Sequence, residues 1–183
     1  IIYGQGAIRC HPWVQKQMSA IAAKDLVAFD HALFGHLGMV ASNAFRSLAY
    51  GLTGGALASS PVGGAAGAAV RRLARTSANF ALVSDAAMAT LGGTLKRKEK
   101  ISGRLADALA WMYVASATVK RFVDDGQPER EWPYFRYSMD NAFFKAQTAL
   151  VGVLDNLPNR PAAWALHVAV FPFGPRWKAP SDA

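Results

Sequence analysis

The amino-acid sequence predicts an all-α fold, an antiparallel helical bundle of four to six helices. Apolar residues recur every three or four positions through several long segments, which is the pattern of helices with one buried face. No segment alternates apolar and polar residues for long enough to predict a strand. The same segments are rich in alanine, which lets neighbouring helices pack closely. With 183 residues, 52% of them hydrophobic, the chain can bury a sizeable core.

The N-terminal half predicts three helices separated by breaks. Pro12 suits the first turn of a helix, because proline lacks the N–H that this position leaves unpaired. Asp25 is a predicted N-cap for a helix over residues 26–52. The segment 53–67 is rich in Gly, Ala and Ser and is predicted to be a connector. A further apolar stripe runs over residues 73–91, with Ser60 and Pro61 as its predicted start.

The C-terminal half predicts three further segments of regular spacing. An apolar stripe over residues 101–122 ends before Gly126, a residue typical of helix C-termini. The next stripe, over residues 135–157, begins after Pro133 and must end before Pro158, because proline disfavours a helical residue before it. A short helix over residues 161–171 follows Asn159. It is too short to span a bilayer, and no apolar run in the chain reaches the length that spanning requires.

The net charge and the number of cysteines limit the partners and the cellular compartment that we expect for the protein. The formal net charge is +8. Two basic clusters carry part of it, and they consist of Arg71, Arg72 and Arg75 and of Lys96, Arg97, Lys98 and Lys100. Neither is interleaved with aromatic residues as single-strand binding requires, so we expect solvated basic faces and no nucleic-acid partner. A lone cysteine, Cys10, excludes an intramolecular disulfide and suggests a reducing compartment.

Two motifs near the N-terminus resemble reactive sites but lack essential parts. Gly4-Gln5-Gly6 matches the start of a dinucleotide-binding loop, but Arg9 stands where the third glycine belongs. Cys10 and His11 pair a thiol with a base. Adjacent residues rarely place their side chains for proton transfer, so we expect a packed thiol beside a helix-capping histidine.

The remaining titratable residues do not form a catalytic or metal-binding motif in the sequence. His31 and His36 lie five positions apart, which is about 140° around a helix and not the spacing of paired zinc ligands. His167 stands in an apolar stretch and is expected to be a satisfied core or interface residue. Asp85 and Asp107 flank apolar stripes and are expected to form structural ion pairs, with candidate partners Arg75, Arg104 and Lys120. We therefore predict no catalytic, cofactor-binding or metal-ligating residue in this chain.

Three long blocks of the sequence resemble a known enzyme family. The opening IIYGQGAIRCHPWV resembles the segment after the catalytic glutamate of bacterial long-chain (FadE-type) acyl-CoA dehydrogenases. The resemblance continues in SDAAMATLGGTLKRKEKISGRLADALAWMYVASATVKRF, over residues 84–122, and in NLPNRPAAWALHVAVFPFG, over residues 156–174, with APSD near the end. It therefore covers nearly the whole chain in order. The family's Glu-Gly motif is absent from this sequence, so no catalytic residue can be transferred to it.

The resemblance implies a function for the enzyme as a whole. Members bind FAD and oxidise fatty acyl-CoA to trans-2-enoyl-CoA in β-oxidation, and they pass electrons to an electron-transferring flavoprotein. It implies that residues 1–11 end the dehydrogenase's C-terminal helical domain and form a junction, and that residues 12–183 form an appended helical domain. We expect this portion to be structural, with contacts to a homodimer partner, the membrane or the electron acceptor. The expected location is the cytoplasm, with peripheral contact to the inner membrane.

A stand-alone protein is the alternative to the enzyme fragment. The chain would then be a basic helical adaptor or a membrane-surface protein without catalytic activity. That alternative predicts a start codon near Ile1, whereas the fragment predicts a long open reading frame upstream. The gene sequence immediately before Ile1 separates the two.

Overall fold

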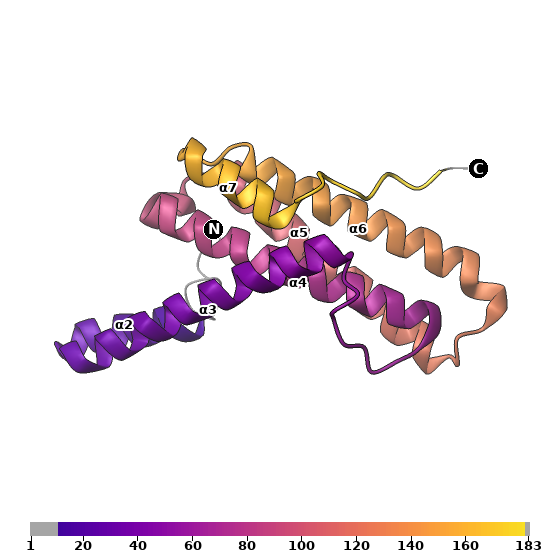
Figure 1. Cartoon of the computed structure of the whole chain (residues 1–183), viewed down its shortest axis with the longest axis horizontal. Coiled ribbons are helices and arrows are strands. Elements are labelled where there is room, and N and C mark those ends of the chain that lie inside the picture. Colours follow the sequence, from indigo (N-terminus) through magenta and orange to yellow (C-terminus); the bar gives the residue numbers. More distant parts are fainter. Residues whose placement is uncertain (1–10, 182–183) are drawn as a thin grey trace.

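The computed structural model describes residues 11–181 and confirms the all-α fold, with six α-helices and no strand over this range (Figure 1). The elements in chain order are α2 (Pro12–Ala23), α3 (Leu26–Thr53), α4 (Gly64–Leu91), the 3-10 helix η1 (Gly92–Lys96), α5 (Glu99–Asp124), the 3-10 helix η2 (Glu129–Glu131), α6 (Trp132–Leu154) and α7 (Arg160–Val170). The junction predicted for residues 1–11 lies, except for His11, outside the described residues.

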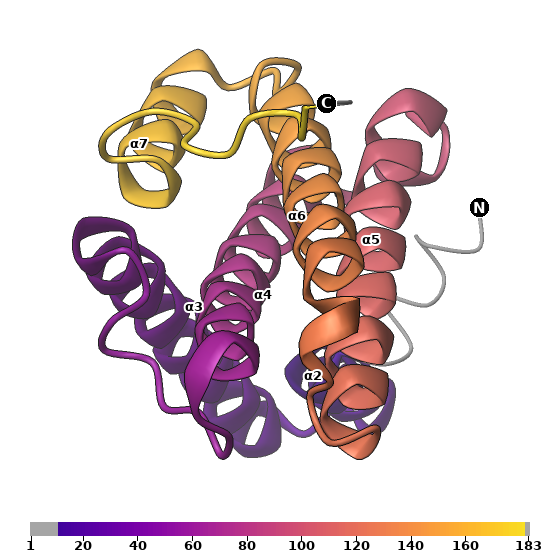
Figure 2. The same cartoon turned by 90° about the vertical axis from the view of Figure 1, so that its right-hand side faces the viewer.

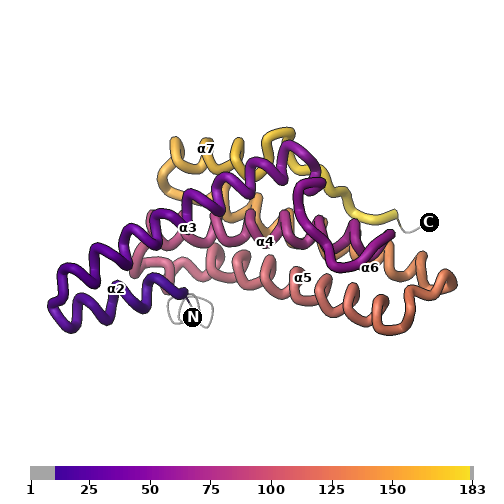
Figure 3. The backbone as a smooth tube through the Cα atoms, turned by 60° about the horizontal axis from the view of Figure 1, so that its bottom comes forward, coloured from indigo at the N-terminus to yellow at the C-terminus, as the bar shows by residue number. Residues whose placement is uncertain are grey.

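Successive long helices run in opposite directions, as the sequence predicts (Figures 1 and 2). Helices α4, α5 and α6 pack against one another, and α3 and α7 cover one side of α4 and α6. The hairpin of α2 and α3 forms an arm, of which α2 and the N-terminal part of α3 project past the end of the other helices (Figure 3). The rest of α3 packs against α4 and α7.

Two apolar clusters form the core, one toward each end of the bundle. The first joins α4, α5, α6 and α7 around Leu105, Val153 and Leu154, all of which are fully buried. The second is aromatic and contains Phe135 and Phe143. Alanines of α4 and α5 reach these clusters with almost no exposed surface, which confirms that small side chains allow the helices to approach closely.

Local caps confirm most of the predicted helix starts. The Asp25 carboxylate accepts a hydrogen bond from the Ala28 N–H at 2.9 Å, and the Asn159 side chain accepts one from Ala162 at 3.1 Å. The predicted start of α4 at Ser60 and Pro61 is wrong, because the helix begins at Gly64. The Ser60 hydroxyl instead donates to the Val62 carbonyl at 2.8 Å, which closes a turn within the connector.

The helix predicted from the 135–157 stripe ends before Pro158, as expected, but it begins at Trp132, before Pro133 and not after it. Helix α6 ends at Leu154, yet Leu157 remains fully buried in the first apolar cluster. The apolar spacing therefore continues past the last helical residue, because the chain after the helix still packs against the core.

Two glycines of α3 should respond in opposite ways to alanine. A Cβ on Gly35 would overlap the indole ring of Trp13, whereas nothing lies within 4 Å of a Cβ on Gly38. We expect Gly35→Ala to destabilise the domain by about 1–3 kcal/mol through overpacking. Gly38→Ala should stabilise it by about 0.5–1 kcal/mol through helix propensity alone. Urea unfolding of both variants measures this, and equal effects would contradict the close packing of α2 on α3.

The last residues form an extended segment, the C-terminal strap (residues 171–181), which runs back along α6 (Figures 1 and 3). The buried amide of Gln147 holds the strap: its Nε2 donates to the Trp177 carbonyl at 2.8 Å. Its Oε1 accepts from the N–H groups of Arg176 and Trp177 at 2.9 and 3.1 Å. One side chain thus pairs three backbone groups that would otherwise have no regular partner.

The prediction that the first basic cluster forms a solvated face is wrong for Arg75, because the strap packs on this residue. The guanidinium of Arg75 lies 5.4 Å from the Trp177 ring centroid, and Arg75 is almost fully buried. Burial lowers the pKa of Arg75, and the nearby charge of Arg176 lowers it further. Arg72, by contrast, stays exposed and pairs with Asp140 at 3.0 Å.

Candidate functional site

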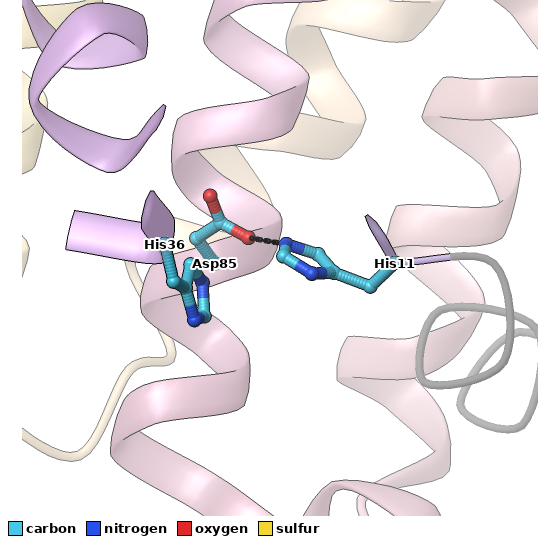
Figure 4. Close-up of side chains that lie close together, drawn as sticks. All are labelled: His11, His36 and Asp85. Carbon is cyan, nitrogen blue, oxygen red and sulfur yellow. Dashed lines mark ion pairs between the residues drawn. The ribbon is translucent and has the colours of Figure 1, made fainter. Parts of the chain in front are cut away.

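Three titratable side chains meet in a partly buried cluster, the His11–His36–Asp85 cluster (Figure 4). His11 is the N-cap of α2, His36 lies on α3 and Asp85 lies on α4. One nitrogen or oxygen atom from each residue lies within 4.8 Å of the corresponding atoms of the other two. His11 Nε2 is 3.3 Å from Asp85 Oδ1, an ion-pair distance, and both side chains are more than nine-tenths buried.

This cluster corrects two sequence-based interpretations. Asp85 pairs with His11 and not with Arg75, Arg104 or Lys120. The fold also brings two histidines together with an acidic residue, although in the sequence His36 has no acidic neighbour at the spacing of metal ligands. The three residues come from separate helices, and only the tilt of the α2–α3 arm against α4 brings them together.

The hydrogen bonds of His11 decide which ring nitrogen carries the proton. Its Nδ1 accepts from the backbone N–H groups of Trp13 at 3.2 Å and Val14 at 3.1 Å. Nδ1 must therefore be unprotonated, and the proton of the neutral ring lies on Nε2, which faces Asp85. This arrangement confirms the predicted capping role of His11.

Burial favours the neutral forms of the two closest partners. It lowers the pKa of His11, opposed by the charge of Asp85. It raises the pKa of Asp85, opposed by the charges of His11 and His36. Desolvation penalises whichever form is charged, so the two groups shift in opposite directions.

The donor set of the cluster does not fit a metal ion. A metal-bound imidazole keeps its proton on the nitrogen that faces away from the metal, and this nitrogen donates a hydrogen bond. In His11 that nitrogen is Nδ1, which faces two N–H donors and must accept from both. Coordination at Nε2 would leave the ring without a proton. We therefore interpret the cluster as a buried polar contact that joins the arm to α4.

Replacing His11 by asparagine should change the pH dependence of stability. Because the pKa of His11 is lowered from 6.5, the unfolded chain binds more protons as the pH falls through that value, and the folded state loses stability. Asparagine keeps an N-cap acceptor but does not titrate. We expect His11→Asn to gain stability relative to wild type between about pH 7.5 and about pH 5.5.

Thermal melts across this pH range measure the difference. His31→Asn is the matched control, because His31 is exposed and belongs to α3 but not to the cluster. Parallel pH profiles for wild type and His11→Asn would show that the buried histidine does not couple to folding.

The other residues considered from the sequence lie apart from this cluster. His167 is partly exposed and contacts Asp155 at 3.1 Å, which confirms that it is satisfied. Asp107 is exposed, so the buried ion pair expected for it is wrong. The candidates Gly4, Gln5, Gly6, Arg9 and Cys10 lie outside the described residues.

An apolar groove of about 780 Å³ lies beside the cluster, between α3, α4, η1 and α7. Its walls include Val40, Ala44, Leu82, Ala86 and Leu166. Lys96 is the cation among its lining residues. FAD requires several N–H groups or cations around its pyrophosphate and polar partners along the flavin ring. The groove supplies neither set, so its residues do not fit FAD.

The second basic cluster remains on the surface, as predicted. Lys96, Arg97, Lys98 and Lys100 are all exposed at the turn between η1 and α5. Within residues 11–181, no helix combines the length and the apolar character needed to cross a bilayer.

Comparison with known protein families shows which family the chain belongs to. A family model described as acyl-CoA dehydrogenase, C-terminal, bacterial type, matches residues 8–183. The chain belongs to this family. The match confirms the resemblance to the C-terminal region of bacterial acyl-CoA dehydrogenases, oxidoreductases that act on acyl-CoA and generally use FAD. No solved structure matches the chain.

Proposed function

We propose that this bacterial-type acyl-CoA dehydrogenase C-terminal domain, residues 12–183, is the appended helical part of an FAD-dependent enzyme. The whole enzyme would oxidise fatty acyl-CoA to trans-2-enoyl-CoA in β-oxidation. The domain itself would supply contact surfaces and no catalytic group, and FAD and the catalytic base would be held by the dehydrogenase core. The family membership and the unsuitability of the groove for FAD support this division.

The apolar surface of the arm is the observation that carries the proposal. Val27, Phe34 and Phe45 on α3 are 81%, 70% and 73% exposed. Met18 and Ile21 on α2 are also exposed. Apolar patches of this kind on a soluble domain mark interaction sites, because water contact with them is unfavourable. We assign the dehydrogenase core of the same enzyme as their partner, since the family is a C-terminal region that a core precedes.

Substitution of the partly buried cluster in the full-length enzyme tests the non-catalytic role. A triple variant, His11→Asn, His36→Gln and Asp85→Asn, removes every titratable group of the His11–His36–Asp85 cluster. We expect the variant to keep its flavin absorbance and a turnover within about threefold of wild type. Loss of a general acid or base lowers turnover by about 10²–10⁴-fold, and a loss of that size in a folded variant would contradict the proposal.

Contacts beyond the core belong to the same proposal. They comprise a homodimer partner, the electron-transferring flavoprotein and the surface of the inner membrane. The exposed cluster at Lys96–Lys100 favours the membrane contact, because each basic residue near an anionic surface contributes about 1 kcal/mol. Sedimentation of the full-length enzyme with anionic liposomes should decrease at high salt. Absence of lipid-dependent pelleting at low salt would exclude this contact.

A further inference from the structure

The groove between α3, α4 and α7 has the lining of a site for a flexible hydrocarbon chain. Its volume of about 780 Å³ lies in the range of sites for small molecules. Apart from the His36 ring, the lining contains no aromatic side chain, and much of it is alanine, leucine and valine. Aliphatic walls without flat rings offer no stacking surface. They suit an unbranched alkyl chain better than a planar ligand.

The polar groups along one wall do not interrupt this lining. His36 and Asp85 border the groove, but their atoms His36 Nε2 and Asp85 Oδ2 are fully buried. Asp85 Oδ1 faces His11 Nε2 in the His11–His36–Asp85 cluster, where desolvation favours the neutral form of the carboxyl. The groove therefore presents these residues mainly through their carbon atoms.

The exposed charged residue that lines the groove is basic. Lys96 borders the groove and is exposed, and Arg97, Lys98 and Lys100 follow directly in the chain. Within residues 11–181, no carboxylate forms an ion pair with any of these four side chains, and Glu99 is the one acid among them. Unpaired cations beside an apolar groove complement an anionic headgroup attached to an apolar chain.

We propose that this groove binds the single acyl chain of an anionic amphiphile, with its headgroup against Lys96 and the adjacent basic residues. The inference rests on the lining and the charge of the groove and does not require the proposed catalytic function. The site lies wholly within this chain. A bound chain can therefore be located by the residues that it contacts, independently of any acyl-CoA bound in the dehydrogenase core.

Photolabelling of the full-length protein tests the site. The probe is palmitate with a diazirine near the chain terminus, and mass spectrometry maps the labelled peptides. We expect adducts on groove residues of α3, α4 and α7. Ala86→Leu, which fills the groove from α4, should reduce these adducts about tenfold. Ala117→Leu, the same change at an exposed position of α5, should leave them unchanged.

The headgroup contact is tested with a second probe. The matched diazirine alcohol carries the same chain without the carboxylate. Lys96→Glu should weaken labelling by the palmitate probe and leave labelling by the alcohol unchanged. Lys145→Glu, at an exposed position of α6, controls for the change in net charge.

Three results would overturn the proposal. They are adducts that fall outside the groove, groove adducts that Ala86→Leu does not reduce, and equal effects of Lys96→Glu on both probes. If Ala86→Leu fails to fold, Ala44→Leu fills the groove from α3 and takes its place. These experiments do not measure turnover of the enzyme. A failure of the groove proposal would therefore leave the proposed catalytic function unaffected.

Discussion

Replacing Phe143 by alanine is expected to lower the free energy of unfolding by about 3–5 kcal/mol. Phe143 is 1% exposed and lies in the aromatic cluster with Phe135 and Met139. Its ring centroid is also 5.1 Å from that of Trp177 in the C-terminal strap. The substitution therefore creates a cavity between α6 and its neighbours and removes the ring on which the strap packs.

Chemical denaturation followed by tryptophan fluorescence measures this loss. Phe173→Ala is the matched control, because Phe173 is 62% exposed on the C-terminal strap and its truncation should change the stability by no more than about 0.5 kcal/mol. Similar losses for both variants would mean that the aromatic cluster contributes little to the core.

Replacing Gln147 by methionine is expected to detach the C-terminal strap at a cost of about 2–4 kcal/mol. Methionine keeps the length of the side chain but cannot pair the backbone groups of Arg176 and Trp177. Each buried polar group left without a partner costs about 1–3 kcal/mol. Release of the strap would also expose the buried face of Arg75, which Trp177 covers.

Hydrogen exchange followed by mass spectrometry reads this release directly. In wild type, the Arg176 and Trp177 amides are protected by the Gln147 carbonyl. In Gln147→Met their protection should fall toward that of a free segment, whereas Lys145→Met, at an exposed position of α6, should not change it. Full protection in Gln147→Met would show that ring packing alone holds the strap.

The sequence predicted the helices closely because their signals are local. Asp25 and its apolar stripe predict a helix over residues 26–52, and α3 runs over Leu26–Thr53. The cap and the spacing both lie within the segment that they define. The helix start predicted at Ser60 and Pro61 was wrong because the same residues can also form a closed turn. Whether a helix or a turn forms depends on how the connector packs against Gly67, where a Cβ would overlap the Val62 carbonyl.

The candidate site could not be predicted because it depends on distances between helices. The apolar neighbours of Asp85 indicate burial, but they do not show which of the surrounding helices supplies its partner. His11 becomes that partner because Pro12 begins α2 beside α4 and the cap fixes its ring. Arg75 is a similar case, since its place in a basic cluster predicts a solvated side chain, whereas Trp177 of the strap, a distant part of the chain, packs on it.

Hydroxyl-radical footprinting of the full-length enzyme tests most directly whether the domain docks through its arm. The readout is the oxidation of Phe34 and Phe45 on α3 compared with Phe173 on the strap, which is 62% exposed. All three are phenylalanines, so their intrinsic reactivities match. The account predicts that Phe34 and Phe45 are protected in the assembled enzyme while Phe173 is oxidised. Equal oxidation of all three would contradict it.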